Sequence, residues 1–349
     1  MTVKKVLHIV GSMNQTKQLH KIASEMPEYD HYYTQYFGSG KILKYLAENG
    51  LVDFTILGTK SSFRKLQERY LKDHNCNYDY RGSSLNNRYD LVLTCSDIII
   101  PQEITYAPIV FIQEGMTDPV TAISKFINKY NLPSWMAGDT SLNGTSNKCD
   151  VYCAASNGYA DFFTEMGTEG SKVYVTGIPN FDNVDEFLNN DFPHRDYVLV
   201  CTSDLREVKK RDNRIGFLEN CKNVAKGRKI IFRLHPNENH ERASQEIRSI
   251  FSADTLIYTS GNTEQMIANC SELITQYSST VYVGIGLGKP VHSNMDLEQL
   301  YQRMPIQNGG KSAYYISLLC KDILELGSIS ENNRSYFGYK TFSEKLRYA

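Results

Sequence analysis

The chain has 349 residues, of which 41% are hydrophobic and 22% are charged, and its formal net charge is −1. This length is about twice that of a typical domain, so the chain can form two domains with sizeable cores. The balanced charge gives no reason to expect a nucleic-acid partner. The eight cysteines are scattered without the spacing of a zinc site, and free thiols fit a reducing cytosol.

The amino-terminal half alternates short apolar runs with helical segments, which is typical of a parallel α/β sheet. The first apolar run ends at Val10 and is too short for a signal peptide, and no segment approaches the roughly twenty apolar residues of a membrane span. The expected strands are residues 1–10, 31–37, 53–57, 91–94, 109–112, 151–156 and 173–176, and the expected helices are 16–26, 40–48, 60–73, 121–129 and 157–166.

Two segments of this half could contact an acceptor. Residues 131–148 are polar, contain the only tryptophan, Trp135, and predict a long loop that lines or covers an acceptor site. The helix at 60–73 has a basic face that could touch a lipid-linked acceptor, although a solvated face is the simpler interpretation.

A linker follows the strand at 173–176, because Gly177 permits a close backbone approach and Pro179 stiffens the exit of the chain. We place this linker at about residues 182–195. The strands expected beyond it are residues 196–201, 229–234, 255–258, 273–275 and 290–292. The glycine-rich residues 284–288 lie at the end of a helix and indicate a packed turn instead of a dinucleotide fingerprint.

Polar residues follow several strands of the second domain, where a parallel sheet presents a ligand site. His235 ends one strand, and Ser278 and Ser279 open a helical segment after another. Hydroxyls and unpaired backbone N–H groups at a helix start attract anions, and histidine adds a donor that can carry charge near neutral pH. We therefore predict a phosphate- or diphosphate-binding site. Its predicted residues are Thr202, Arg233, His235, Pro236, Ser278, Ser279, Thr280 and Glu298.

Three motifs follow one another in the second domain: Arg233-x-His235-Pro236, the Leu-Ile-Thr-x-Tyr-Ser-Ser run of residues 273–279, and Lys289-Pro290. This series resembles the carboxyl-terminal half of the CDP-glycerol glycerophosphotransferases. The same half resembles more loosely the bacterial sialyltransferases, the Kdo transferases and the UDP-N-acetylglucosamine 2-epimerases. This resemblance implies the GT-B fold, an α/β architecture in which two Rossmann-like domains with parallel sheets face each other across a nucleotide-sugar cleft. The implied divisions are residues 1–182, 196–335, and a carboxyl-terminal helix within 336–349 that returns to the first domain.

The chain departs from these families at informative positions. Gln276 stands where the glycerophosphotransferases usually have Asp, and Glu114 precedes Gly115 where they have His. The Ser-Gly-Gly-x-x-Glu-Glu signature of the epimerases is absent. The resemblance therefore implies Glu114 as the general base, which requires burial to raise its proton affinity. Asp97 and His8 are the next candidates.

The resemblance implies a glycosyltransferase, or a glycerophosphotransferase-like enzyme, of bacterial surface-polysaccharide or capsule assembly. It would move a sugar unit from a CMP-, CDP- or UDP-linked donor to a saccharide or lipid-linked hydroxyl acceptor, with His235 stabilising charge on the leaving group. This scheme needs no metal and no other cofactor. We expect a cytoplasmic protein, with peripheral contact at the inner face of the membrane as an option. The alternatives are an enzyme like the UDP-N-acetylglucosamine 2-epimerases and a non-catalytic nucleotide-binding module.

Overall fold

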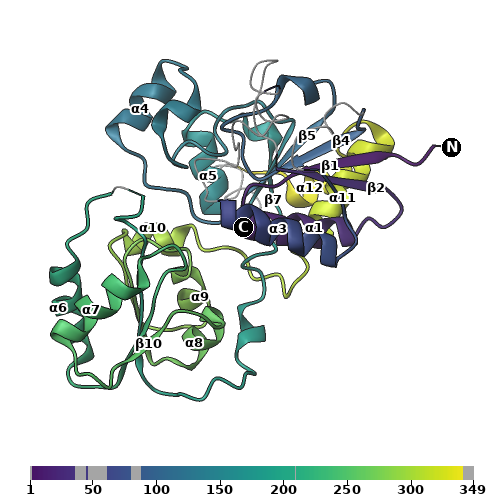
Figure 1. Ribbon diagram of the computed structural model, residues 1–349. Coiled ribbons are helices and arrows are strands. Elements are labelled where there is room, and N and C mark those ends of the chain that lie inside the picture. Colours follow the sequence, from purple (N-terminus) through teal and green to yellow (C-terminus); the bar gives the residue numbers. More distant parts are fainter. Residues whose placement is uncertain (1, 36–44, 46–60, 80–87, 209, 341–349) are drawn as a thin grey trace. The chain divides into compact units, whose positions relative to one another are not determined.

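The computed structural model describes all residues except 1, 36–44, 46–60, 80–87, 209 and 341–349 (Figure 1). The chain separates into two compact units, unit 1 with residues 1–182 and 308–349 and unit 2 with residues 183–307. Apart from Tyr45, the expected helix at 40–48 and the strand at 53–57 lie outside the described residues. The same holds for residues 341–349 of the carboxyl-terminal helix expected within 336–349.

The described part of unit 1 contains a seven-stranded sheet with the order β3-β2-β1-β4-β5-β6-β7. All neighbouring strands run parallel, as the alternation of apolar runs and helices predicts. The strands are β1 (Lys5–Ile9), β2 (Asp30–Thr34), β3 (Asn77–Asp79), β4 (Leu91–Thr94), β5 (Ile109–Ile112), β6 (Val151–Ala154) and β7 (Val173–Val175).

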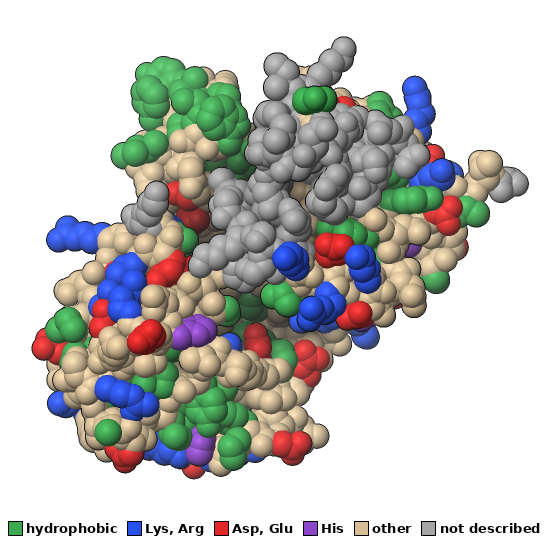
Figure 2. All heavy atoms as spheres, in the orientation of Figure 1, with side chains coloured by type: hydrophobic (Ala, Val, Ile, Leu, Met, Phe, Trp, Pro, Cys, Tyr) green, Lys and Arg blue, Asp and Glu red, His purple; other side chains and the backbone are tan. Residues whose placement is uncertain are grey.

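Helices and short 3₁₀ turns connect these strands. They are α1 (Met13–Ser24), α3 (Ser61–Asp73), η3 (Gln102–Ile104), α4 (Ala122–Lys129), η4 (Ser134–Ala137), α5 (Asn157–Glu165) and η5 (Gly170–Lys172). Two further helices of unit 1, α11 (Ser312–Leu326) and α12 (Glu331–Phe337), follow unit 2 in the sequence. Hydrophobic side chains also gather on the surface of unit 1 over α4 (Figure 2). None of the described helices is both long enough and apolar enough to cross a membrane.

The second boundary of the domains differs from the expected one. We expected residues 196–335 to form the second domain, but residues 308–335 belong to unit 1. The reason is the packing of α11, whose Ile316 and Leu319 are fully buried in the same core cluster as Leu19 and Ile22 of α1. This helix therefore completes the core of unit 1.

Unit 2 contains, among its described residues, a five-stranded parallel sheet with the order β10-β9-β8-β11-β12. The strands are β8 (Val198–Cys201), β9 (Ile230–Arg233), β10 (Leu256–Tyr258), β11 (Glu272–Thr275) and β12 (Val291–His292). The connecting elements are η6 (Val184–Phe187), α6 (Arg214–Ala225), α7 (His240–Ile250), α8 (Thr263–Asn269), α9 (Val281–Gly286) and α10 (Leu297–Gln302).

Glycine brings α9 close to the sheet of unit 2. A Cβ atom on Gly284 would lie 2.7 Å from Leu273 and 2.9 Å from Val291, so a larger residue would push α9 away from β11 and β12. The segment 284–288 spans the end of this packed helix, which confirms that it is a helix end and turn.

The strand order reverses its direction once in each unit, between β1 and β4 in unit 1 and between β8 and β11 in unit 2. In open parallel sheets, ligands bind outside the carboxyl ends of the strands at this reversal. These two sheet edges are therefore the places to examine for function.

Candidate functional site

In unit 1, the carboxylate at the strand reversal is Glu114, which directly follows Gln113 at the end of β5. The Ser12 hydroxyl donates a hydrogen bond of 2.7 Å to Oε1, and the Gln15 side-chain amide donates one of 2.7 Å to Oε2. Ser12 is also the N-cap of α1, where its hydroxyl accepts from the Gln15 N–H at 3.0 Å. The side chain of Asn180 donates to the main-chain oxygen of Glu114 at 3.0 Å. The turn between β1 and α1 thus orients the carboxylate.

The surroundings of Glu114 favour proton uptake. Burial raises the pKa of this carboxyl above its usual range, and the hydrogen bonds from Ser12 and Gln15 oppose that rise only in part. No ion pair involves Glu114 among the described residues. Each oxygen accepts one hydrogen bond and keeps a further lone pair. The group can therefore act as a proton acceptor.

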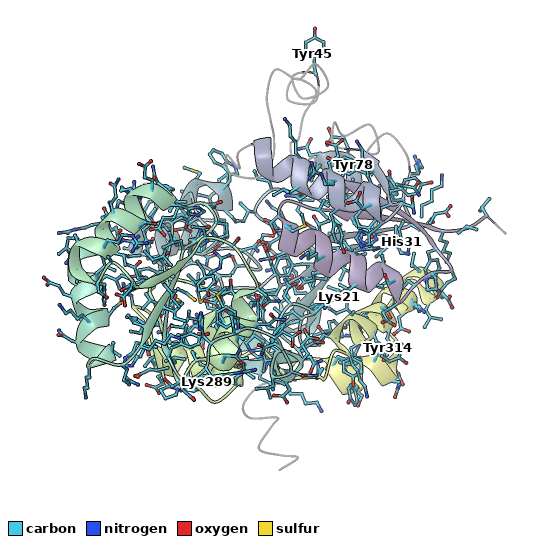
Figure 3. The ribbon with its side chains drawn as sticks, turned by 60° about the horizontal axis from the view of Figure 1, so that its bottom comes forward. Lys21, His31, Tyr45, Tyr78, Lys289 and Tyr314 are labelled. Atoms are coloured by element: carbon cyan, nitrogen blue, oxygen red, sulfur yellow. The ribbon has the colours of Figure 1, made fainter. Side chains whose placement is uncertain are left out.

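Buried glutamines support this sheet edge, and the sequence analysis did not identify them. Gln67 donates to the main-chain oxygen of Gly11 at 3.2 Å, and Gln18 donates to that of Gln113 at 2.9 Å. Tyr78, labelled in Figure 3, donates to Gln35 at 2.9 Å. The available signal was the placement of glutamine on the apolar face of α1. The buried glutamines are Gln15, Gln18, Gln35, Gln67 and Gln113.

The two reserve candidates for a base are engaged elsewhere in unit 1. Asp97 is fully buried, and its carboxylate accepts hydrogen bonds from the N–H groups of Gly144 at 2.7 Å and Ser146 at 2.9 Å. His8 lies within β1, also fully buried, with Nε2 2.9 Å from Nδ1 of His31. Both side chains are buried in unit 1 and form hydrogen bonds within it.

In unit 2, Ser203 joins the two strand ends at the reversal. Its hydroxyl accepts from the Tyr277 N–H at 3.2 Å and donates to the Tyr277 carbonyl at 3.2 Å. The guanidinium of Arg214 donates to the carbonyl of Ser203 at 3.3 Å, and Gln276 donates to Asp212 at 3.2 Å. The residues after β8 and β11 therefore form one hydrogen-bonded edge.

His235 follows β9 on the same edge and presents a donor. Its Nδ1 accepts from the Asn237 N–H at 3.2 Å and lies 3.6 Å from the carboxylate of Asp204. Burial lowers the pKa of His235, and the charges of Asp204 and Glu238 oppose that shift. The neutral ring therefore carries its proton on Nε2, for which the described residues supply no hydrogen-bond partner. Thr202 accepts from the His235 N–H at 3.0 Å and holds this turn.

The predicted hydroxyls after β11 lie together. Ser278, Ser279 and Thr280 are each partly buried and directly precede α9. The hydroxyls of Ser278 and Thr280 are 2.9 Å apart, and the Ser278 hydroxyl also accepts from the Thr280 N–H at 3.4 Å. The N–H groups of residues 281–283 donate to the carbonyls of residues 278–280. Hydroxyl groups are thus concentrated next to the reversal.

The other predicted donor-site residues take different places. Arg233 is buried and donates to the Thr263 hydroxyl at 3.1 Å and to the Leu234 carbonyl at 2.6 Å, so it links the end of β9 to the start of α8. Pro236 is exposed in the turn after β9. Glu298 is exposed in the first turn of α10. Among the described residues, neither Arg233 nor Glu298 forms a hydrogen bond with His235 or with the hydroxyls of residues 278–280, although the charge of Arg233 helps to lower the pKa of His235.

A charged network beneath this edge was also missed by the sequence analysis. Arg214 is 4% exposed and donates to Asp212 at 3.1 Å and to Glu238, which in turn accepts from Thr202. Arg206 donates to Asp212 at 3.0 Å. Nη1 of Arg214 is buried without a partner in the described part of the chain. The alternation of charges within residues 204–214 was the only available signal.

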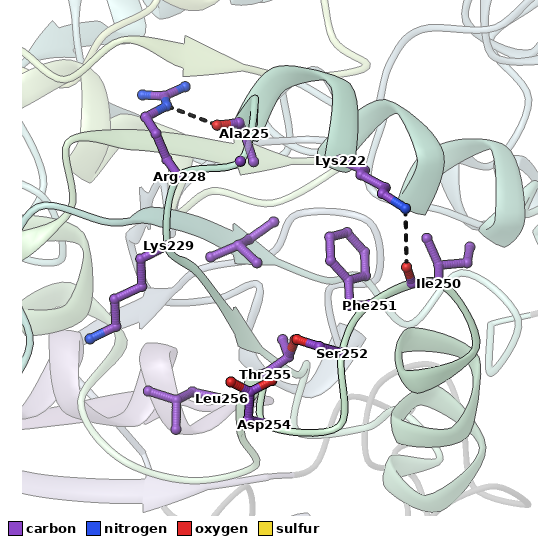
Figure 4. Close-up of a pocket in the computed structure, with 12 residues that line it drawn as sticks. Lys222, Ala225, Arg228, Lys229, Ile250, Phe251, Ser252, Asp254, Thr255 and Leu256 are labelled. Carbon is purple, nitrogen blue, oxygen red and sulfur yellow. Dashed lines mark hydrogen bonds between the residues drawn. The ribbon is translucent and has the colours of Figure 1, made fainter.

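Unit 2 has a hollow, shown in Figure 4, at the end of its sheet opposite to the edge that carries His235. Ile230 and Leu256, the first residues of β9 and β10, line it. Two of its cations donate to main-chain oxygens, Arg228 to Ala225 at 3.0 Å and Lys222 to Ile250 at 3.5 Å. Arg228 also pairs with Glu272, and Nζ of Lys229 lies 3.1 Å from Nδ1 of His194. This hollow is separate from the edge that carries His235. No group of three or more His, Cys, Asp or Glu side chains within the described ranges could hold a metal ion.

No family model matches the chain, and no curated protein does either. Solved structures share its fold. The wall teichoic acid polymerase TagF is 12% identical, with 93% of this chain and 89% of that chain covered and a TM-score of 0.52. A UDP-GlcNAc 2-epimerase from Neisseria meningitidis, bound to UDP-GlcNAc, is 12% identical, with coverages of 89% and 98% and a TM-score of 0.51. The S. aureus MnaA–UDP co-structure is 11% identical, with coverages of 93% and 98% and a TM-score of 0.51.

These likenesses and the two parallel sheets define a fold of the GT-B type, with two Rossmann-like α/β domains. The fold predicted from the sequence is thereby confirmed.

Proposed function

We propose that this protein is a transferase that moves a sugar, or a polyol-phosphate unit, from a nucleotide-activated donor to a hydroxyl acceptor in bacterial surface-polysaccharide assembly. The observation that carries the proposal is Glu114, a carboxylate of raised pKa that Ser12 and Gln15 orient at the strand reversal of unit 1. Enzymes tune carboxylates in this way for general-base catalysis near neutral pH.

Unit 2 supplies donors suited to a nucleoside diphosphate or monophosphate. His235 offers Nε2–H, and Ser278 and Ser279 offer hydroxyls in the turn that directly precedes α9. Neutral donors of this kind stabilise charge that develops on a departing phosphate. We assign Arg233 and Thr202 to the support of this edge, because their recorded hydrogen bonds hold the turns after β9 and β8. TagF with CDPG and the epimerase bound to UDP-GlcNAc support a nucleotide-linked donor.

For a sugar donor, the acceptor oxygen forms a bond to the anomeric carbon while its proton passes to the Glu114 carboxylate. The bond between the anomeric carbon and the phosphate oxygen breaks, and the nucleotide leaves with that electron pair. Hydrogen bonds from His235 and the serine hydroxyls stabilise the negative charge on the departing oxygen.

A second candidate is an epimerase that acts on the same class of nucleotide sugar. The fold it shares with the N. meningitidis UDP-GlcNAc 2-epimerase favours it. An epimerase needs no acceptor, whereas the transferase releases nucleotide in proportion to acceptor glycosylation. A non-catalytic nucleotide-binding module would neither isomerise the donor nor release its nucleotide.

The test is incubation of the purified protein with CMP-, CDP-, UDP- and GDP-linked donors, with and without a saccharide or lipid-linked acceptor. We expect nucleotide release that depends on acceptor, and a loss of about a hundredfold or more in Glu114→Gln at unchanged nucleotide affinity. The matched control is Glu25→Gln, at an exposed glutamate of unit 1. Isomerisation of the donor without acceptor would establish the epimerase, and nucleotide binding without turnover would establish the module.

A further inference from the structure

An exposed apolar surface covers the outer face of α4 and the adjoining η4, and we call it the α4–η4 surface. Its exposed fractions run from 36% at Leu132 to 67% at Ile123, and Figure 2 shows the hydrophobic side chains gathered over α4. Single exposed hydrophobic residues are ordinary, but a contiguous apolar patch marks an interaction surface. Its residues are Ile123, Phe126, Tyr130, Leu132, Trp135 and Met136.

The inner face of α4 is firmly attached to unit 1. Ile127 is buried, the hydroxyl of Ser124 lies 2.7 Å from that of Ser141, and Asn128 donates to the Met166 carbonyl at 2.8 Å. Thr121 and Ser124 form a capping box at the start of the helix. Hydrogen bonds therefore fix which face of α4 points outward, and that face is the apolar one.

The charge of this surface has one sign. Residues 119–138 contain no Asp or Glu, and they carry Lys125 and Lys129, both exposed and one helical turn apart. The flanking acids are engaged at the base of the segment. Asp118 accepts from the Thr140 hydroxyl at 2.8 Å, and Asp139 accepts from the Ser141 N–H at 3.0 Å. The α4–η4 surface therefore combines apolar side chains with two exposed lysines and has no acidic residue within residues 119–138.

Aromatic and aliphatic side chains beside lysines suit the headgroup region of a lipid bilayer. Tryptophan and tyrosine prefer this region, apolar side chains enter the boundary of the acyl chains, and lysines are attracted to anionic headgroups. Protein–protein interfaces differ, because they are depleted in lysine. We propose that the α4–η4 surface docks the protein on an anionic lipid membrane. This inference rests on the surface alone and does not depend on the proposed reaction.

The chain offers its own probe of docking, since Trp135 is its only tryptophan and lies on the surface concerned. The purified full-length protein is mixed with vesicles of phosphatidylcholine, with and without phosphatidylglycerol. We expect cosedimentation with the anionic vesicles and a shift of tryptophan emission to shorter wavelength. Added salt should weaken both signals, because it screens the lysines.

Two matched pairs of variants locate the contact. Ile123→Ser with Phe126→Ser should weaken binding at least about tenfold, since each loses a large apolar side chain from the lipid phase. Leu326→Ser with Tyr336→Ser, at residues 64% and 72% exposed elsewhere in unit 1, should bind as the unaltered protein does. Lys125→Glu with Lys129→Glu should also weaken binding at least about tenfold. The control is Lys17→Glu with Lys21→Glu, at exposed lysines of the same spacing on α1 (Lys21 is labelled in Figure 3), and it should not weaken vesicle binding.

Absence of cosedimentation together with unshifted tryptophan emission would overturn the proposal. Equal binding by the unaltered protein and by Ile123→Ser with Phe126→Ser would overturn it as well. Sedimentation velocity tests the remaining possibility. If the unaltered protein does not bind vesicles but forms a dimer, and Ile123→Ser with Phe126→Ser dissociates that dimer, the α4–η4 surface binds a second copy of the chain instead.

Discussion

Ser278 and Ser279 directly precede α9, next to the strand reversal of unit 2. If they bind the donor phosphate, replacing both by alanine should weaken nucleotide binding by about 1–3 kcal/mol, the usual value of hydrogen bonds to a charged group. Isothermal titration calorimetry measures this change. Ser249→Ala, at an exposed serine of α7, is the control and should bind normally. Unchanged affinity in the double variant would remove both serines from the site.

His8 and His31 form a buried pair in which the hydrogen bonds define the protonation state. Nε2 of His31 lies 2.8 Å from the carbonyl of Met26 and donates to it, so Nδ1 of the neutral ring accepts from Nε2 of His8 at 2.9 Å. The remaining Nδ1 of His8 is buried without a partner in the described chain, and the ring stacks on Tyr33 at 4.6 Å. An extra proton on this pair would have no acceptor.

This pair predicts a loss of stability in acid. Burial lowers the pKa of His8 well below 6.5, and it also lowers the pKa of His31. Between these lowered values and about 6.5, the unfolded chain binds more protons than the folded one, so stability falls as the pH falls. We expect a loss of about 1 kcal/mol or more between pH 7 and pH 5, measured by urea unfolding. His8→Phe retains an aromatic ring at this position but removes the group that titrates. The free energy of unfolding of this variant should therefore change less with pH than that of the unaltered protein. Identical pH dependence in both proteins would contradict this account.

At the scale of elements, Asp97 organises the segment 131–148. Its carboxylate accepts from the N–H groups of Gly144 and Ser146, and its own N–H donates to Asn143 at 3.1 Å. The backbone of Gly144 has a φ of 87°, which glycine adopts without strain. This carboxylate therefore substitutes for regular secondary structure in holding a long connection.

We expect Asp97→Asn to lower the free energy of unfolding by about 2–3 kcal/mol, because the new amide group would face an N–H donor with no acceptor. Chemical denaturation measures the loss, and nucleotide affinity per folded molecule should not change. Asp90→Asn serves as a control at an exposed aspartate that accepts from the Lys5 N–H at 2.8 Å. A variant as stable as the unaltered protein would show that the loop is held by other contacts.

The elements differ in how far the sequence could predict them. The strands at 91–94 and 109–112 were predicted at the bounds that the structure has, because short apolar runs between polar residues leave few alternatives. The sequence could place Glu114 after a strand, but its partners Ser12 and Gln15 lie about a hundred residues earlier in the chain. Contacts over such separations depend on strand order. For the same reason, the sequence could suggest Arg233 as a phosphate ligand but could not predict its hydrogen bonds to Thr263 and Leu234.

At the scale of the whole molecule, the two units have separate hydrophobic clusters. Leu319 of α11 is fully buried in unit 1, and Ile247 of α7 is fully buried in unit 2. Truncation of either to alanine should cost about 2–5 kcal/mol through lost burial and a cavity. Hydrogen exchange followed by mass spectrometry should show faster exchange in unit 1 for Leu319→Ala and in unit 2 for Ile247→Ala. Faster exchange throughout the chain in both variants would mean that the units unfold together.

The route of the chain has a consequence for synthesis on the ribosome. Unit 1 is interrupted after Asp182 and resumes at Asn308, so its core lacks the side chains of α11 until the residues beyond 307 are made. The interrupting stretch is continuous and complete by Gln307. During translation, domains fold as units once their residues emerge. We therefore expect the nascent chain to complete the sheet of unit 2 before the core of unit 1. Until α11 and α12 are made, residues 1–182 keep an uncovered apolar face.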